Sequence, residues 1–149
     1  MNKTAENFMK AAVLYALSGI TLGIAMAASH DFGVSSAHAH LSLLGWVSMA
    51  LFAFYYQLVP HMAEAGVAKA HFWISNFGVV MLSGSVILMA SGYIAAEAGA
   101  VIGAIALLVS TLIFAYVVFA AKECTHGKQK MMFCNSSTFA SLSNSSKHI

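Results

Sequence analysis

From Ala98 to Ala121 the chain reads AGAVIGAIALLVSTLIFAYVVFAA, without one charged residue. A stretch of this length and hydrophobicity is typical of a helix that crosses a lipid bilayer, which takes roughly 20 apolar residues. Three more stretches lack charged residues, at 11–28, 32–63 and 70–96. Each has room for one span. The sequence therefore predicts transmembrane helices at about 9–29, 37–59, 71–93 and 98–121, the second of them ending at Pro60, the only proline.

The overall composition supports the same fold class. Of the 149 residues, 60% are hydrophobic and 8% are charged, whereas soluble domains average about a quarter charged residues. The connections between the predicted spans are short, so we expect one domain, an all-α up-down bundle of four antiparallel helices in a lipid bilayer. The net charge of +2 is too small to predict nucleic-acid binding. After Ala121 the chain becomes rich in Lys, Ser and Asn, and we expect residues 122–149 to form a polar, mobile cytoplasmic tail.

The lysines predict how the bundle is oriented. All seven basic residues are lysines, and all fall on one side of a four-span topology. By the positive-inside rule, both termini are predicted to be cytoplasmic, in a multi-pass protein of the inner (cytoplasmic) membrane. The connections that carry Asp31 and Glu97 then face outward. Cys124 and Cys134 lie in the reducing cytoplasm and are expected to be free thiols.

The first span has an alternative interpretation. Lys3, Lys10, the apolar run after them and Ala25-Met26-Ala27 also match a signal peptide with its cleavage site. The apolar run continues to Ala28, however, which is long enough for a membrane span. We expect the helix to be retained.

Two other patterns concern packing. Gly19 and Gly23 in the first helix, and Gly99 and Gly103 in the fourth, have the spacing of small residues at helix contacts, either inside the bundle or across a homodimer. The aromatic residues at the predicted boundaries are expected to form interfacial belts. They are Tyr55, Tyr56, Trp73 and Tyr93.

Seven histidines are many for so short a membrane chain, and the topology separates them. His30, His38 and His40 are predicted at the outer face. His61 and His71 flank the inner loop, where solvation explains them adequately. Histidines of the two groups cannot readily meet across roughly 30 Å of hydrocarbon. The other two, His126 and His148, belong to the tail.

The sequence Ala37-His38-Ala39-His40 is the sharpest feature. Residues two apart project about 200° apart around a helix axis, so these imidazoles point to opposite sides and could serve two neighbouring cofactors. Hydrogen bonding at the membrane boundary is the simpler explanation of the pair. His30 lies at the same level and could join a metal site, with Met26 and Met89 as soft ligands.

From His38 the chain reads His-Ala-His-Leu-Ser-Leu-Leu-Gly-Trp-Val-Ser-Met, then Phe54-Tyr-Tyr-Gln-Leu-Val-Pro60. This stretch resembles the tenth helix of the catalytic subunit of haem-copper oxidases, most of all the C-type oxidases and nitric oxide reductases. His71-Phe-Trp-Ile-Ser-Asn-Phe-Gly78 is similar to the helix that follows there. His30-Asp31 precedes His38 as a similar pair does in other oxidases of that superfamily. The resemblance covers about half of the chain.

The resemblance implies that His38 corresponds to the axial ligand of a high-spin haem and His40 to a ligand of a low-spin haem. His30 and Asp31 would lie above the haems, near propionates or a structural cation, as secondary candidates for metal binding. The copper ligands of the family come from earlier helices that are not in this chain. We therefore do not expect oxygen reduction at a haem-copper pair, although the resemblance is to an oxidoreductase.

These patterns predict a haem b-binding membrane protein that transfers electrons or binds a small ligand near the outer face. A homodimer would double the outer histidines and could supply a second axial ligand to the iron. One alternative is a copper-binding or oxidase-assembly protein that uses His30, His38, His40 and the outer methionines. The other is a structural accessory subunit without a cofactor.

Overall fold

The computed structural model of the chain describes residues 2–63 and 66–145, with side chains through Ala121. Every regular element in these residues is a helix. In chain order they are α1 (Lys3–Ser29), α2 (Ser35–His40), the π-helix η1 (Leu41–Val47), α3 (Ser48–Leu58), α4 (Pro60–Ala63), α5 (Gly66–Ala90), the 3₁₀ turn η2 (Ile94–Ala96) and α6 (Glu97–Ser145).

Four helical stretches are long and apolar enough to cross a membrane, namely Lys3–Ser29, Ser35–Leu58, Gly66–Ala90 and Ile94–Ala121. The predicted all-α fold with four spans is confirmed, and the chain is a multi-pass membrane protein. The first and third helices begin several residues earlier than predicted, at Lys3 and Gly66. The earlier start of α5 changes the position of His71, as described below.

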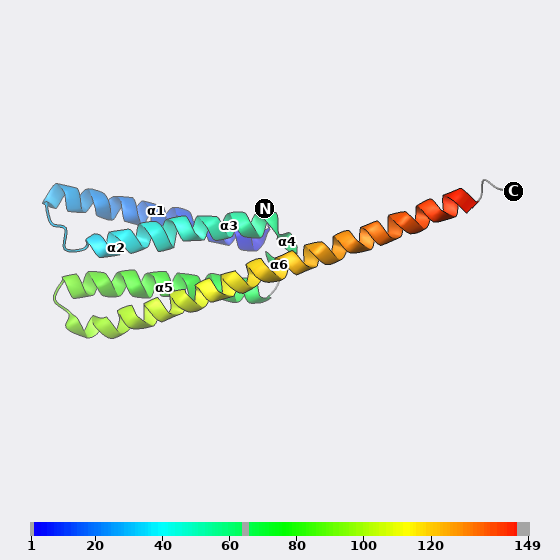
Figure 1. Ribbon diagram of the computed structural model, residues 1–149. Coiled ribbons are helices and arrows are strands. Elements are labelled where there is room, and N and C mark those ends of the chain that lie inside the picture. The colour runs from blue at the N-terminus through cyan, green and yellow to red at the C-terminus, as the bar shows by residue number, and fades with distance from the viewer. Residues whose placement is uncertain (1, 64–65, 146–149) are drawn as a thin grey trace. The chain divides into compact units, whose positions relative to one another are not determined.

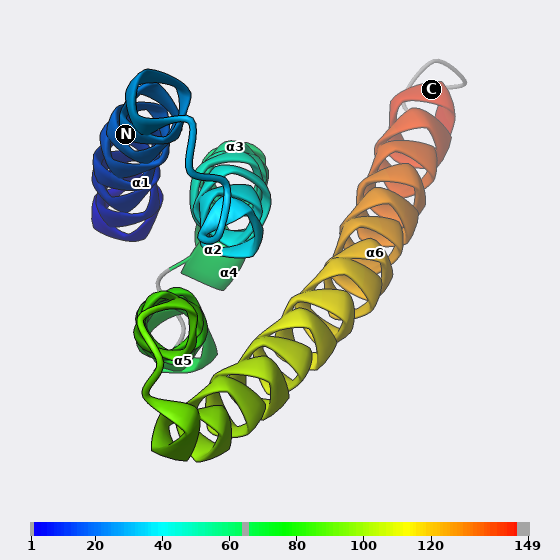
Figure 2. The same ribbon diagram turned by 90° about the vertical axis from the view of Figure 1, so that its left-hand side faces the viewer.

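The chain forms two units, residues 1–114 and 115–149. In the first unit, successive spans run antiparallel (Figure 1). Seen end-on, α1, α2–α3 and α5 form a triangle, and the first turns of α6 lie beside α5 (Figure 2). The described part of the second unit continues α6 to Ser145. The change in composition at Lys122 therefore does not end the helix, whereas residues 146–149 of the predicted tail lie outside the described residues.

We name the two ends of the first unit by their charges. The acidic-loop end holds the connections between α1 and α2 and between α5 and α6, with Asp31 and Glu97. The lysine end holds Lys3 and Lys10 near the start of α1, and Lys69 near the start of α5. Which end faces the cytoplasm stays a prediction.

Both pairs of small residues pack inside the first unit. A Cβ on Gly19 would lie 2.9 Å from Ser42 Oγ, and one on Gly23 would lie 3.0 Å from His38 Cε1. A Cβ on Gly103 would lie 2.5 Å from the backbone nitrogen of Leu82, and Gly99 meets the same helix, α5. Of the two alternatives for this spacing, contact within the bundle accounts for all four glycines, so they no longer argue for a dimer.

Polar contacts hold the start of α1 at the lysine end. Asn2 caps the helix, because its Oδ1 accepts from Ala5 N at 2.8 Å, and its Nδ2 donates to the Tyr56 carbonyl at 2.8 Å. The buried Thr4 hydroxyl donates to the Ala63 carbonyl at 2.7 Å. The first turn of α1 is thus bonded to the end of the second span and to α4.

Candidate functional site

His38 is held against α1 by one hydrogen bond. Its Nδ1 lies 2.8 Å from the carbonyl oxygen of Gly19. Because a carbonyl only accepts, Nδ1 carries the proton, and the lone pair of the neutral ring is then on Nε2. A histidine that ligates a metal usually has this arrangement, with its other ring N–H donated to a backbone carbonyl or carboxylate.

Small residues on α1 make this contact feasible. The His38 ring lies over Gly23, where a Cβ would be only 3.0 Å from Cε1 and 3.3 Å from Nδ1. Gly19 supplies the acceptor one turn earlier in α1 and is itself buried. The half-buried imidazole thus occupies space that side chains on α1 would otherwise fill.

His40 has a different environment. It follows His38 by two residues on α2, so its side chain leaves the helix about 200° away from that of His38. In the triangle of spans, α2 contacts both α1 and α5 (Figure 2). The Nδ1 atom of His40 is buried and has no hydrogen-bond partner among the described residues. A buried, unpaired polar atom costs about 1–3 kcal/mol, and no hydrogen bond in the described part of the chain offsets this cost at His40.

A π-helix begins directly after these histidines. In η1 the chain winds more widely than in an α-helix, and Ser48 N donates to the Leu43 carbonyl five residues earlier. Gly45 within η1 lies against α1, where a Cβ would come 2.7 Å from Tyr15. Such π-helical turns are frequent at functional sites, because they alter which face of the helix later residues occupy. The sequence pattern had given no sign of this turn.

His30 and Asp31 have structural roles at the acidic-loop end. His30 ends α1 in the left-handed conformation, with φ 54°. The Asp31 carboxylate accepts from Gly33 N at 2.9 Å and so closes the turn that leads to α2. Both side chains are exposed. The helix end and the turn that follows it therefore explain both residues without a cofactor.

The described side chains do not form a complete set of metal ligands. Among the side chains described, residues 2–63 and 66–121, no three His, Cys, Asp or Glu gather as metal ligands. A copper site made of His30, His38 and His40 from one chain is thus not assembled. Of the two methionines considered with them, Met26 is buried and Met89 is exposed.

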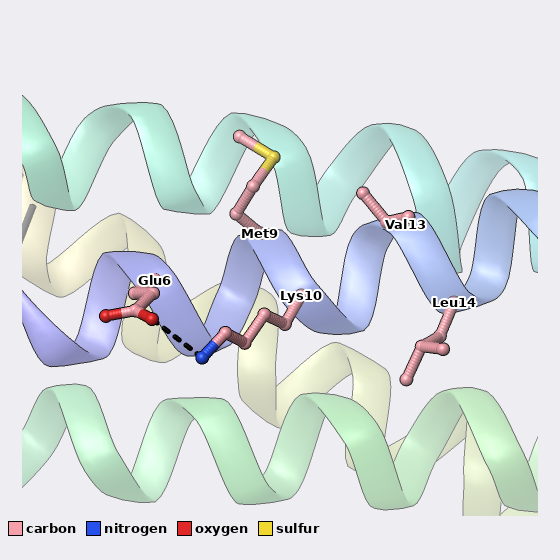
Figure 3. A pocket seen from close by; sticks show the side chains of 5 residues that line it. All are labelled: Glu6, Met9, Lys10, Val13 and Leu14. Atoms are coloured by element: carbon pink, nitrogen blue, oxygen red, sulfur yellow. Dashed lines mark ion pairs between the residues drawn. The ribbon is translucent and has the colours of Figure 1, made fainter.

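A shallow groove of about 490 Å³ lies elsewhere, along one face of α1 (Figure 3). The described residues that line it all come from α1 and are mostly apolar: Glu6, Met9, Lys10, Val13 and Leu14. Glu6 and Lys10 form an ion pair one helical turn apart at 2.6 Å. None of the described lining residues is a histidine, and neither His38 nor His40 is among them, so the groove is separate from the candidate site.

At the lysine end, the expectation that His71 is a solvated loop residue is wrong. Its side chain is 0% exposed, because α5 begins at Gly66 and places His71 inside the helix bundle. The Tyr56 hydroxyl lies 3.0 Å from its Nδ1. Tyr56 is also fully buried rather than part of an interfacial belt, whereas Trp73 is 71% exposed and Tyr93 is 66% exposed. His61 is exposed as expected.

Comparison with known proteins gives one partial similarity. The chain is 34% identical over 61 residues to the cbb3-type cytochrome c oxidase subunit CcoN1 of Stutzerimonas stutzeri. The match covers 37% of this chain and 13% of that subunit, so the chain corresponds to a small part of its length. No family model matches the sequence. No solved structure matches it either.

Proposed function

We propose that this chain binds haem b at His38 and His40 and uses it for electron transfer or small-ligand binding at the acidic-loop end. The observation that carries the proposal is the bond from His38 Nδ1 to the Gly19 carbonyl. It leaves Nε2 as the basic nitrogen, which is what iron ligation requires. The partial similarity to an oxidase subunit supports the same chemistry.

The residues present fit a haem in two respects. His38 has a fixed tautomer, and His40 has a buried ring nitrogen without a protein partner. When bound, haem iron with two imidazole ligands carries an electron, and with an open position it binds a small ligand. The chain itself would supply the imidazoles, and α1 would fix the orientation of the His38 ring.

A homodimer is part of the proposal. The two imidazoles leave α2 on opposite sides, so one iron cannot readily take both from the same chain. A two-fold axis normal to the membrane would bring a second copy of each histidine to the interface and complete the ligand set. We place this site on the outer side of the inner membrane, in agreement with the lysine distribution.

The test is an absorption spectrum of protein purified in detergent from haem-replete cells, together with iron and copper quantification. We expect a Soret band and iron in the wild type. His38→Ala and His40→Ala should change the spectrum in different ways, whereas His61→Ala, an exposed histidine at the other end, should leave it unchanged.

Copper without iron would support a copper-binding or assembly protein. Neither metal would support a structural accessory subunit. Either result would overturn the proposal, and so would spectra that are the same in wild type, His38→Ala and His40→Ala.

A further inference from the structure

The buried histidine at the lysine end is not part of the proposed haem site. His71 is 0% exposed, and it lies among aromatic rings from the other three spanning helices. The ring centroids lie 4.6 Å from Phe52, 5.1 Å from Phe8 and 5.8 Å from Phe114 and Tyr56. We call His71 and these four residues the His71 cluster.

The polar atoms of His71 are only partly satisfied. Nδ1 shares a hydrogen bond with the Tyr56 hydroxyl at 3.0 Å, whereas Nε2 is buried and has no partner among the described residues. A neutral imidazole carries its one N–H on either Nδ1 or Nε2, and because the Tyr56 hydroxyl can donate or accept, Nδ1 is paired in both tautomers. A charged imidazole has two N–H donors. One would bond to Tyr56, and the other would face aromatic carbon.

Among the described side chains around the ring, no carboxylate compensates for such a charge. Tyr56 is the one titratable side chain among the described contacts of the ring, and Tyr55 lies beyond it against Tyr56 and Phe114. α1 contributes Phe8 and α6 contributes Phe114. On α5 itself, Ser75 uses its hydroxyl to donate to the His71 carbonyl and to bond Ser110. A charged ring would therefore have one buried N–H donor without an acceptor among the described residues, and this favours the neutral form.

The cluster is also where the helices are joined. Phe8 is on α1, Phe52 and Tyr56 on α3, His71 on α5 and Phe114 on α6, so a change at His71 affects four helices together. The Tyr56 carbonyl in addition accepts from Asn2 at the start of α1. The acidic-loop end has separate packing contacts, such as those of Gly99 with Ser85 and of Gly23 with His38.

We propose that the His71 cluster is an acid-sensitive latch that holds the lysine end of the bundle closed. With His71 neutral, the four helices stay together. When the end loosens, the ring reaches water and takes up a proton, so the open form binds more protons than the closed form. The stability of the closed end is then complete above about pH 6.5, the ordinary range of imidazole, and is lost as the pH falls below it. This inference does not depend on haem binding.

The first experiment compares thermal unfolding of the full chain in detergent at pH 8 and pH 5. We expect the wild type to lose at least about 3 °C more in Tm on acidification than His71→Phe does, which corresponds to the order of 1 kcal/mol in a chain of this size. His61→Phe, an exposed histidine at the same end, should show the wild-type drop. An equal drop in wild type and His71→Phe would overturn the proposal.

A second variant covers the case in which His71→Phe alone does not fold. His71→Phe with Tyr56→Phe removes both hydrogen-bond partners together, which costs less than leaving the Tyr56 hydroxyl unpaired. On acidification its Tm should fall at least about 3 °C less than that of the wild type, and an equal fall would overturn the proposal.

Hydrogen exchange of the wild type gives an independent measurement. After correction for intrinsic rates, amides around Tyr56 and His71 should lose about tenfold protection between pH 8 and pH 5, which corresponds to about 1.4 kcal/mol of local stability. Amides around Ser83, at the other end, should keep their protection over the same pH range. Equal changes at the two ends would contradict a local latch.

Discussion

Gly23 sets how closely the His38 ring approaches α1. A methyl group at this position would lie 3.0 Å from Cε1, closer than carbon atoms normally pack. Gly23→Ala should therefore move the ring off its bond to Gly19, with a loss of about 1 kcal/mol or more in unfolding free energy and a lower haem content per chain. Gly84→Ala is the matched control, since a Cβ there meets nothing within 4 Å. Unchanged haem binding in Gly23→Ala would show that the His38–Gly19 contact has no role.

The sequence marks His38 and His40 as candidate ligands through their spacing and the resemblance, but it does not show what surrounds them. The acceptor on Gly19 is a backbone atom and leaves no trace in residue type. His71 was missed because the third helix was expected to start at residue 71, which put its side chain in a loop. Two signals in the sequence could have indicated that His71 is buried. Ser75 lies four residues later, on the same face of a helix, and aromatic residues follow directly after Leu51 and after His71.

Gly103 brings α6 close to α5. A Cβ on Gly103 would meet the backbone of Leu82 at 2.5 and 2.9 Å, and a backbone cannot rotate away as a side chain can. Gly103→Ala should force the two helices apart and lower the unfolding free energy by about 1–3 kcal/mol. Chemical denaturation in mixed micelles, beside Gly84→Ala, measures the difference. Equal stability in the two variants would mean that α6 does not pack as described.

Helix α1 is needed by the rest of the first unit. It supplies Phe8 to the His71 cluster, the Gly19 acceptor to His38 and the Tyr15 hydroxyl that donates to Asn76 at 2.9 Å. Cleavage after Ala27 would remove all three. We therefore predict that the intact mass of the membrane-extracted protein includes α1. A mass that begins near Ala28 would support the signal-peptide interpretation instead.

Among the elements, the four spans could be predicted because hydrophobicity and length decide them. Their exact starts could not, since Lys3 and Lys69 are inside helices that charge patterns would begin later. The π-helix η1 was equally hidden. Its hydrogen bonds span five residues instead of four. This difference changes neither the composition nor the hydrophobicity of the segment, so it is visible only in the structure.

For the whole molecule, the orientation in the membrane rests on lysine placement alone. We predict that Ala95→Cys, in the exposed turn at the acidic-loop end, reacts with a membrane-impermeant maleimide in intact cells. Gly66→Cys at the lysine end should react only after permeabilisation. Both variants carry Cys124→Ser and Cys134→Ser to remove the native thiols. The opposite pattern would invert the topology and place the candidate haem site on the cytoplasmic side.

The number of chains in the assembly follows neither from the sequence nor from the structure of a single chain. The small residues whose spacing was compatible with a dimer pack inside the bundle. The argument for a dimer therefore depends on the opposite directions of His38 and His40. Cofactor stoichiometry and assembly size are therefore linked, because a bis-imidazole site needs either two chains or a large change in α2.

The haem content per chain is the most direct test of the proposal that the chain binds haem b at His38 and His40. The measurement is the pyridine haemochrome spectrum of the wild-type protein, with the protein concentration from amino-acid analysis and the assembly size from light scattering. We predict haem b at no less than one per two chains, in a species containing at least two chains. Wild-type protein from haem-replete cells that is folded, yet carries neither haem nor iron, would contradict the account.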